Sequence, residues 1–388
     1  MDRVMALRGA PAMGVEGKAA SVAPHQPEQP VVLEARPLSA CGDIAEAWVH
    51  LAGRALEPNP FFEPGFLLAA AQHLVAFREV TVLLAWQGAA EGSQRRLLGF
   101  VPVFPRHGFF LPDALIGLSD RRIASGAPLL DRQRAAAVVD TLLSPRRQRL
   151  IDGQGLVLRA IDRDGPLAAS LRELAEGGLR AGFAVTVSPS PGRMPRPGIA
   201  AAEVPEGLTG VKLVEPRSQA ALRDAVEFIL AMEASGLRGR AGAATLHDTR
   251  EVGFLRAMTR HLARSRQCRV GLLMREDDPL AGAILIGRGP LNWLYLGVQD
   301  EAEAERQPLR ALIAAMRRGM PARRIILPTD FALDGDGGVT TADLHLASGT
   351  VATPRDLAGR ARDAIRRSLS RLPRVGGRGL KPPRAGAA

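Results

Sequence analysis

The sequence predicts a mixed α/β fold in two lobes, whose sheets are partly antiparallel and flanked by helices. Short strand runs come in adjacent pairs, and amphipathic helices separate these pairs along the chain. Adjacent pairs indicate hairpins, whereas a doubly wound parallel sheet would alternate single strands with helices. A length of 388 residues is typical of two domains of ordinary size.

The first 30 residues lack hydrophobic periodicity and are predicted to be a disordered N-terminus, 1–30. Residues 31–189 are assigned to an N-terminal lobe. Its first helix, 44–56, is predicted from an apolar face that holds Ala45, Trp48 and Leu51, and prolines in the turn 57–65 end it. Further helices are predicted at 64–73, 131–143 and 166–181, and strands at 80–86, 96–104, 114–118, 128–130, 155–161 and 183–189.

A break rich in proline and glycine, 190–210, is predicted to be the linker between the lobes. Residues 211–353 are assigned to a C-terminal lobe, and residues 354–388 to a basic tail. In this lobe helices are predicted at 218–234, 248–265 and 307–319, and strands at 211–215, 270–275, 281–288, 292–298 and 324–328.

The net charge of +11 is concentrated in the tail. Residues 355–388 carry ten Lys or Arg and two Asp or Glu, so the rest of the chain is close to balanced. This does not favour a nucleic-acid partner. The apolar and cationic faces of 354–372 predict peripheral contact with an anionic membrane, and a solvated helix is the alternative.

The chain shows no apolar run long enough for a membrane helix or a signal peptide. Cys41 and Cys268 are its two cysteines, too few for a disulfide framework. We therefore expect a cytoplasmic protein. The histidines are scattered, so no metal site is predicted. Rossmann and P-loop motifs are lacking in the sequence.

The segment from Met232 to Gly242 is the best functional clue. Three glycines recur there at every third position, with Arg238 and Arg240 between them. Glycine permits tight turns and close backbone approach, and arginine presents a planar fork that suits phosphate or carboxylate. The segment is therefore a candidate anion-binding loop. The alternative is a helix end followed by a solvated loop.

The sequence FILAMEASGLRGRAGAA, from Phe228 to Ala244, resembles the motif of GNAT-type acyltransferases of the CelD-like group, which is associated with cellulose biosynthesis. Asn59–Pro64, Leu97–Phe104 and Phe254–Ala283 resemble further parts of that family in the same order, over about residues 40–330. The resemblance implies two GNAT-like lobes related to the FemABX architecture. It also implies acyl-CoA (acetyl-CoA) as cosubstrate, no permanently bound cofactor, and a small-molecule or sugar-linked amine or hydroxyl acceptor.

The resemblance assigns the cosubstrate site to two parts of the chain. The residues implied to bind acyl-CoA are Arg238, Gly239, Arg240, Gly242, Gln307 and Pro308. The last two open a helix whose backbone N–H groups would bind the CoA pyrophosphate. The chain departs from the family pattern with Leu237 for Trp, Arg238 for Lys, Ala243 for Thr, Gln307 for Ser and Leu309 for Gly.

Direct acyl transfer of this type needs a general base and donors that polarise the thioester. Glu233, Asp300 and Glu301 are the candidate bases, and Tyr295 is the candidate acid toward the leaving thiolate. The alternatives are strand packing for Tyr295 and a solvated first helical turn for the acidic pair. At the level of the whole protein, the alternatives are a non-catalytic GNAT-like scaffold or binding protein and a basic polyanion-binding protein.

Overall fold

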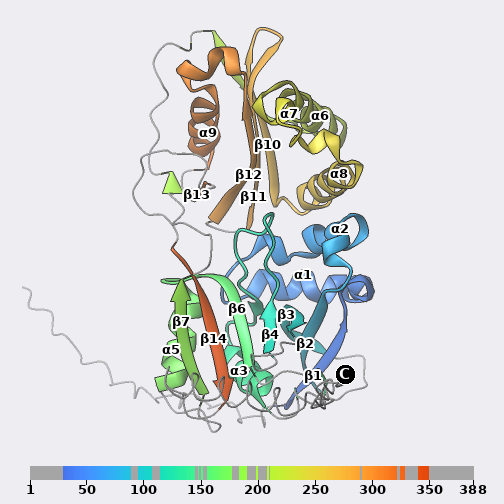
Figure 1. Ribbon diagram of the computed structural model, residues 1–388, viewed down its shortest axis with the longest axis vertical. Helices are drawn as coiled ribbons and strands as arrows, with labels where there is room; N and C mark the ends of the chain where they lie inside the picture. The colour runs from blue at the N-terminus through green and yellow to red at the C-terminus, as the bar shows by residue number, and fades with distance from the viewer. Residues whose placement is uncertain are drawn as a thin grey trace, which may run out of the picture.

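The computed structural model describes residues 29–88, 95–106, 114–144, 147, 150–151, 155–176, 183–189, 198–199, 208, 210–288, 291–320, 324–327 and 340–348. The predicted disordered segment, except for its last two residues, and the basic tail lie outside these ranges. The described part forms two lobes stacked along the long axis of the molecule, with α1 and α2 between the two sheets and α8 beside the second sheet, next to α2 (Figure 1). No helix in this part is long and apolar enough to cross a membrane.

The first sheet belongs to the N-terminal lobe. Its strands, in spatial order, are β1 (Val31–Pro37), β2 (Thr81–Gln87), β3 (Arg96–Arg106), β4 (Ala114–Gly117), β6 (Gly155–Asp162), β14 (Thr341–Ser348) and β7 (Phe183–Pro189), while β5 (Leu129–Leu130) pairs with β3. All these pairs are antiparallel except β4 with β6. The helices of this lobe are α1 (Ala45–Arg54), α2 (Pro64–His73), α3 (Ala135–Leu143) and α5 (Pro166–Glu176).

Both faces of the first sheet are covered by helices. Leu83 on β2 packs in a core with α3 and α5, whereas its neighbours Val82 and Leu84 pack in a core with α1 and α2. Because successive side chains on a strand point to opposite faces, a strand covered on both sides is apolar along its whole length. This arrangement explains why the residues of β2 from Val82 to Trp86 are all apolar and buried.

The second sheet has the spatial order β8 (Gly198–Ile199), β13 (Arg324–Ile326), β12 (Leu291–Gln299), β11 (Asp278–Arg288), β10 (Cys268–Arg275) and β9 (Val211–Val214). β12 and β13 are parallel, and the other pairs are antiparallel. The helices α6 (Gln219–Ser235), α7 (Leu237–Arg240) and α8 (Thr249–Arg264) lie on one side, and α9 (Pro308–Arg318) lies on the other (Figure 1). The predicted mixed α/β class, with two sheets flanked by helices, is confirmed.

The predicted lobe boundaries need correction. β14 comes from residues assigned to the C-terminal lobe, yet it lies between β6 and β7 in the first sheet. β8 comes from the predicted linker and pairs with β13 in the second sheet. β1 precedes every strand that we predicted. Alternating apolar residues such as Leu344 and Leu346 indicate a strand with one buried face. The pattern does not say which of the two sheets the strand joins.

A shared core joins the lobes across two antiparallel helices. Near the start of α2, Gly65 lies against Leu262 at the end of α8, and Gly253 near the start of α8 lies against His73 at the end of α2. A Cβ built on Gly65 would come within 2.9 Å of the Leu262 side chain, and one on Gly253 within 2.6 Å of the His73 ring. Glycine at both crossing points lets the helices approach closely.

Aromatic rings continue this contact between the lobes. Phe61 lies edge-on to Trp293 of β12 at 5.6 Å between ring centroids, and Phe66 lies edge-on to Phe254 of α8 at 5.2 Å. Beside them, the guanidinium of Arg288 on β11 bonds both oxygens of Glu63, whose side chain is 2% exposed. The lobes therefore share both apolar packing and a buried ion pair.

We expect Gly65→Ala to lower the free energy of unfolding by about 1–3 kcal/mol, because the added methyl overpacks the contact with the fully buried Leu262. Denaturant unfolding measures the change. Gly53→Ala is the matched control, since Gly53 lies near the exposed end of α1 and its added Cβ would meet no atom closer than 3.9 Å. That control should be neutral or stabilising by up to about 1 kcal/mol. Equal stability of the two variants would contradict the close helix crossing.

Candidate functional site

The predicted loop 232–242 folds as the end of α6, one helical turn and a reversal. α6 ends at Ser235, because Gly236 is extended, and α7 follows at once. A Cβ on Gly239 would lie 1.7 Å from the carbonyl oxygen of Ala234, which no side chain could avoid. Gly242 has a φ of 68°, a left-handed conformation that favours glycine. The glycine spacing thus serves the backbone of this turn.

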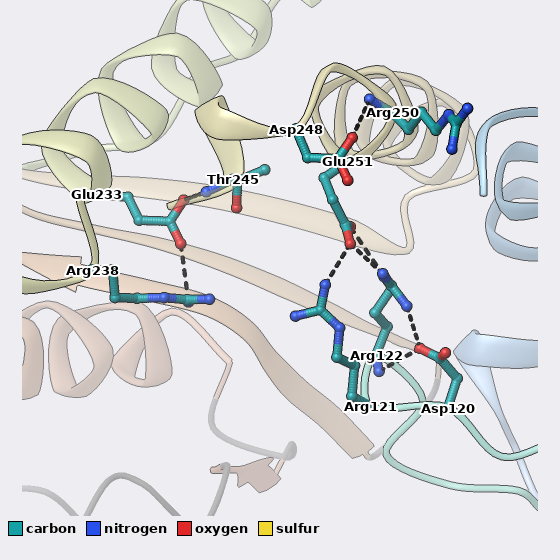
Figure 2. Close-up of polar contacts among 9 residues, drawn as sticks. All are labelled: Asp120, Arg121, Arg122, Glu233, Arg238, Thr245, Asp248, Arg250 and Glu251. Carbon is teal, nitrogen blue, oxygen red and sulfur yellow. Dashed lines mark hydrogen bonds and ion pairs between the residues drawn. The ribbon is translucent and has the colours of Figure 1, made fainter. Parts of the chain in front are cut away.

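Glu233, a candidate base, is buried at the end of α6 with its side chain fully covered. Its Oε2 accepts a hydrogen bond of 2.8 Å from the backbone N–H of Thr245, and its Oε1 lies 2.9 Å from Nη1 of Arg238 (Figure 2). A buried carboxylate needs such partners. In the described structure both oxygens of Glu233 therefore hold α7 and the following η4 (Thr245–His247) in place.

Glu301, another candidate base, connects α7 to η5 (Glu301–Arg306), the turn that follows β12. Its carboxylate accepts from the backbone N–H of Leu237 and from Nη2 of Arg240. The hydrogen bond from Arg240, followed by that from Leu237, lowers the pKa of Glu301 below its ordinary value. The structure thus places the candidate base Glu301 against α7, one of the two segments that the resemblance assigned to the cosubstrate.

Asp300, Gln307 and Pro308 lie in the connection between β12 and α9. Asp300 caps η5, since its Oδ1 accepts from the Ala302 N–H at 3.0 Å. Gln307 has a φ of 51° and a ψ of 52°, which is rare for a residue with a side chain, and it precedes Pro308 at the first position of α9. This connection is therefore a constrained turn that ends at a helix N-terminus.

The N-terminus of α9 offers few donors to an anion. Pro308 has no N–H, and the N–H of Leu309 donates to Oε1 of Gln299 at 3.3 Å. Positive charge is nevertheless close, because Arg275 and Arg306 share the carboxylate of Glu303 at 3.0 and 2.6 Å. To bind the Leu309 N–H, an anionic group would have to displace the Gln299 side chain. It would then lie near the positive charges of Arg275 and Arg306.

β12 pairs with β13 through Leu291–Trp293 and Arg324–Ile326, which is the whole length of β13, and β12 continues to Gln299. α9 forms the crossover between these parallel strands, so its N-terminus lies beyond the carboxyl end of β12. Ligands of open α/β sheets bind in crevices outside the carboxyl ends of strands, which makes this end of the second sheet the candidate site.

Tyr295, the candidate acid, lies apart from the three carboxylates. It is the extra residue of a β-bulge, because Ile284 pairs with Leu296 and the next residue, Leu285, pairs with Leu294. The half-buried ring lies edge-on to Phe66 at 6.0 Å between centroids. Burial raises the pKa of the phenol, which favours its protonated form. Both the packing alternative and a donor role fit this position.

Sequence reasoning missed an ionic cluster in which the N-terminal lobe reaches α8. Nε of Arg122 lies 3.0 Å from Oε2 of Glu251, its Nη1 lies 2.7 Å from Oδ1 of Asp120, and Arg121 also contacts Glu251 (Figure 2). Burial alone would lower the pKa of Arg122, but the bonds to Glu251 and Asp120 outweigh it and raise that pKa. The run Asp-Arg-Arg was visible in the sequence; its partner, 129 positions further on, was not.

The charges of this cluster also act on the pKa of the Tyr295 phenol. Arg122 and Arg121 lower this pKa, whereas Glu251 and Asp120 raise it. Figure 2 shows Arg238 extending from α7 on the same side of the second sheet as this cluster. The segment of the N-terminal lobe that carries Arg121 and Arg122 therefore lies near Tyr295.

A cavity of about 560 Å³ lies elsewhere in the second lobe. It is lined by Leu213, Val214, Glu215, Pro216, Arg217, Leu222, Cys268, Arg269 and Val270. It lies at the start of α6, whereas Glu233 lies near the end of this helix, about 17–20 Å away at 1.5 Å per residue. Within the described ranges, no three His, Cys, Asp or Glu side chains are grouped so as to hold a metal ion.

The sequence matches no protein-family model and no curated protein at a significant level. Solved structures are similar in fold. FemX aligns over 78% of this chain and 95% of its own, with a TM-score of 0.50 and 10% sequence identity. The chain has the two-lobe fold of FemX.

Two further structures align with the FemX-like fold at lower scores. One is L-PGS from Bacillus licheniformis, with 10% identity over 83% of this chain and 96% of that chain and a TM-score of 0.40. The other is a tandem GNAT protein from the clavulanic acid biosynthesis pathway, with 12% identity over 82% and 100% of the two chains and a TM-score of 0.34. The fold assignment rests on the FemX match.

Proposed function

We propose that the protein is a CelD-like acyltransferase of surface polysaccharide biosynthesis. It moves an acyl group from acyl-CoA to an amine or hydroxyl of a small-molecule or sugar-linked acceptor. The observation that carries this proposal is the contact of Glu301 with Leu237 and Arg240. There the segment that carries Arg238 and Arg240, which the resemblance assigned to the cosubstrate, meets the candidate base Glu301 beyond the end of β12. The FemX-like fold supports the same class of chemistry.

In this proposal the donor's phosphates lie between α7 and the N-terminus of α9. Arg238 and Arg240 are 53% and 59% exposed and are the guanidinium groups for the anion. Gly239 and Gly242 shape the turn that carries them, and Gln307 and Pro308 begin the helix on the other side. Transfer is direct, so the acceptor must lose a proton as it attacks the thioester carbon and the thiolate must gain one.

The proton acceptor is Glu233 or Asp300, and Tyr295 is the donor toward the thiolate. Oε1 of Glu233 is the oxygen that would accept the proton, because Oε2 accepts from the Thr245 N–H whereas Oε1 is ion-paired with Arg238 without a hydrogen bond. Asp300 uses Oδ1 to cap η5. Both oxygens of Glu301 are bonded to α7, so we propose no proton-accepting role for it.

A non-catalytic GNAT-like scaffold or binding protein is the second candidate function. Two observations favour it. The Leu309 N–H at the start of α9 already donates to the side chain of Gln299. In addition, Leu309 is a buried leucine, 4% exposed, at a position where the family that the sequence resembles has glycine. Such a protein would keep the fold and the α7 turn but would bind no acyl-CoA.

Calorimetry with acetyl-CoA and longer acyl-CoAs separates the two candidates. We expect saturable binding that is weakened more than tenfold in the double variant Arg238→Ala, Arg240→Ala, because each charge-assisted hydrogen bond contributes about 1.5–3 kcal/mol. The matched control is Arg223→Ala on the exposed face of α6, where Arg223 contacts only its neighbour Asp224 among the described residues. Absence of binding by the unaltered protein to every acyl-CoA would favour the scaffold.

A further inference from the structure

One carboxylate fastens α7 to the connection between β12 and α9. Glu301 accepts through Oε1 from the Leu237 N–H and through Oε2 from Arg240, which precede it by 64 and 61 positions. A Cβ on Gly236 would lie 3.0 Å from Oε1, so glycine gives the carboxylate room to reach the start of α7. The contact thus holds α7 against the connection that leads from β12 to α9.

The same contact occupies an arginine that an anion would need. Arg240 is paired with Glu301, and Arg238 is paired with Glu233, so both guanidinium groups of α7 are neutralised by carboxylates of their own chain. The two pairs differ in burial. Glu233 is fully covered, whereas the side chain of Glu301 is 31% exposed and that of Arg240 is 59% exposed. An exposed ion pair is weak and exchanges readily, so Arg240 is the guanidinium that a ligand can take.

We infer that Glu301 is a positioning residue, which holds Arg240 and α7 against η5 until an anionic group of the ligand takes the guanidinium. The inference rests on the proposed function, in which that group is a phosphate of acyl-CoA. Phosphate engages arginine through two parallel hydrogen bonds and carries more charge than a carboxylate, so it competes well for Arg240. Among the described contacts, loss of this ion pair leaves Glu301 attached to α7 through the Leu237 N–H and loosens the attachment of α7 to η5.

Glu301→Gln tests this role, because glutamine keeps the size of the side chain and removes its charge. We expect inorganic pyrophosphate and acyl-CoA, titrated separately by calorimetry at low salt, to bind this variant about two- to fivefold more tightly than the unaltered protein. Glu301→Asp keeps the charge and should stay close to the unaltered protein. Glu227→Gln is the matched control, since the Glu227–Arg256 pair joins α6 and α8 with contacts of 2.6–2.7 Å. This control should leave both affinities unchanged.

Unchanged or weaker pyrophosphate binding by Glu301→Gln overturns the inference, because a merely structural contact would lower stability and affinity together. The unfolding midpoint of each variant is measured alongside. Tighter pyrophosphate binding without any acyl-CoA binding supports the role of Glu301 and refutes the proposed donor. Acyl-CoA binding that does not tighten in Glu301→Gln supports the donor and refutes the role of Glu301.

Discussion

Arg288→Ala is expected to lower the free energy of unfolding by about 3–5 kcal/mol, since it leaves the carboxylate of Glu63 buried without a countercharge. Glu63 comes from the N-terminal lobe, at the start of α2, and Arg288 comes from β11 of the second sheet. The Glu63 side chain is 2% exposed, so little solvent screens its charge. The variant therefore weakens the junction of the two lobes, and denaturant unfolding measures the loss.

The same variant has a defined pH dependence. Burial raises the pKa of Glu63 above its ordinary value, although the bonds from Arg288 oppose the rise. A raised folded-state pKa means that the folded protein binds the proton more tightly than the unfolded chain. The contribution of Glu63 to stability is therefore complete at acidic pH and is lost as pH rises through the raised pKa. Without Arg288 that pKa rises further, so the deficit of Arg288→Ala should grow from acidic to neutral pH.

Two variants control for this prediction. Glu63→Gln combined with Arg288→Ala removes the buried charge and should recover part of the lost stability. Arg256→Ala breaks a comparable pair with Glu227 whose side chains are 51% and 40% exposed, and it should cost about 1 kcal/mol or less. A loss in Arg288→Ala no larger than in Arg256→Ala would contradict a buried role for the pair.

Gly239→Ala is expected to abolish acyl-CoA binding or to weaken it by more than tenfold. The added Cβ would lie 1.7 Å from the carbonyl oxygen of Ala234 and 2.4 Å from its carbon. These are backbone atoms at the end of α6, so no change of rotamer removes the overlap. α7 must move away, and Arg238 and Arg240 move with it.

Binding measured by calorimetry, together with the unfolding midpoint, distinguishes this local effect from a general loss of the fold. Gly242→Ala is the matched control within the same turn. Its Cβ would meet no atom within 4 Å, and its cost is the left-handed backbone alone, about 1–2 kcal/mol. Gly242→Ala should therefore bind more tightly than Gly239→Ala, and the reverse order would contradict the described geometry of α7.

Much of the local structure was predictable because it depends on near neighbours in the chain. The helix predicted at 64–73 has those bounds, since Pro64 begins it and the apolar residues that follow pack inward. The strand at 183–189 also has its predicted bounds. The placement of β14 was not predictable, because its backbone hydrogen bonds would be equally satisfied at a free place in either sheet. Only packing against the cores selects one of them.

The candidate site also has local features that the sequence predicts and long-range contacts that it does not. By itself, the sequence determined that a helix ends near Gly236 and that a turn built on glycine presents two arginines, because both depend on residues within one or two helical turns. The tertiary structure decided which carboxylates those arginines meet. Arg240 meets Glu301 across 61 positions, and Arg288 meets Glu63 across 225. Such partners are selected by the packing of whole helices and sheets. The sequence alone therefore does not distinguish a carboxylate that accepts a proton from one that holds a turn in place.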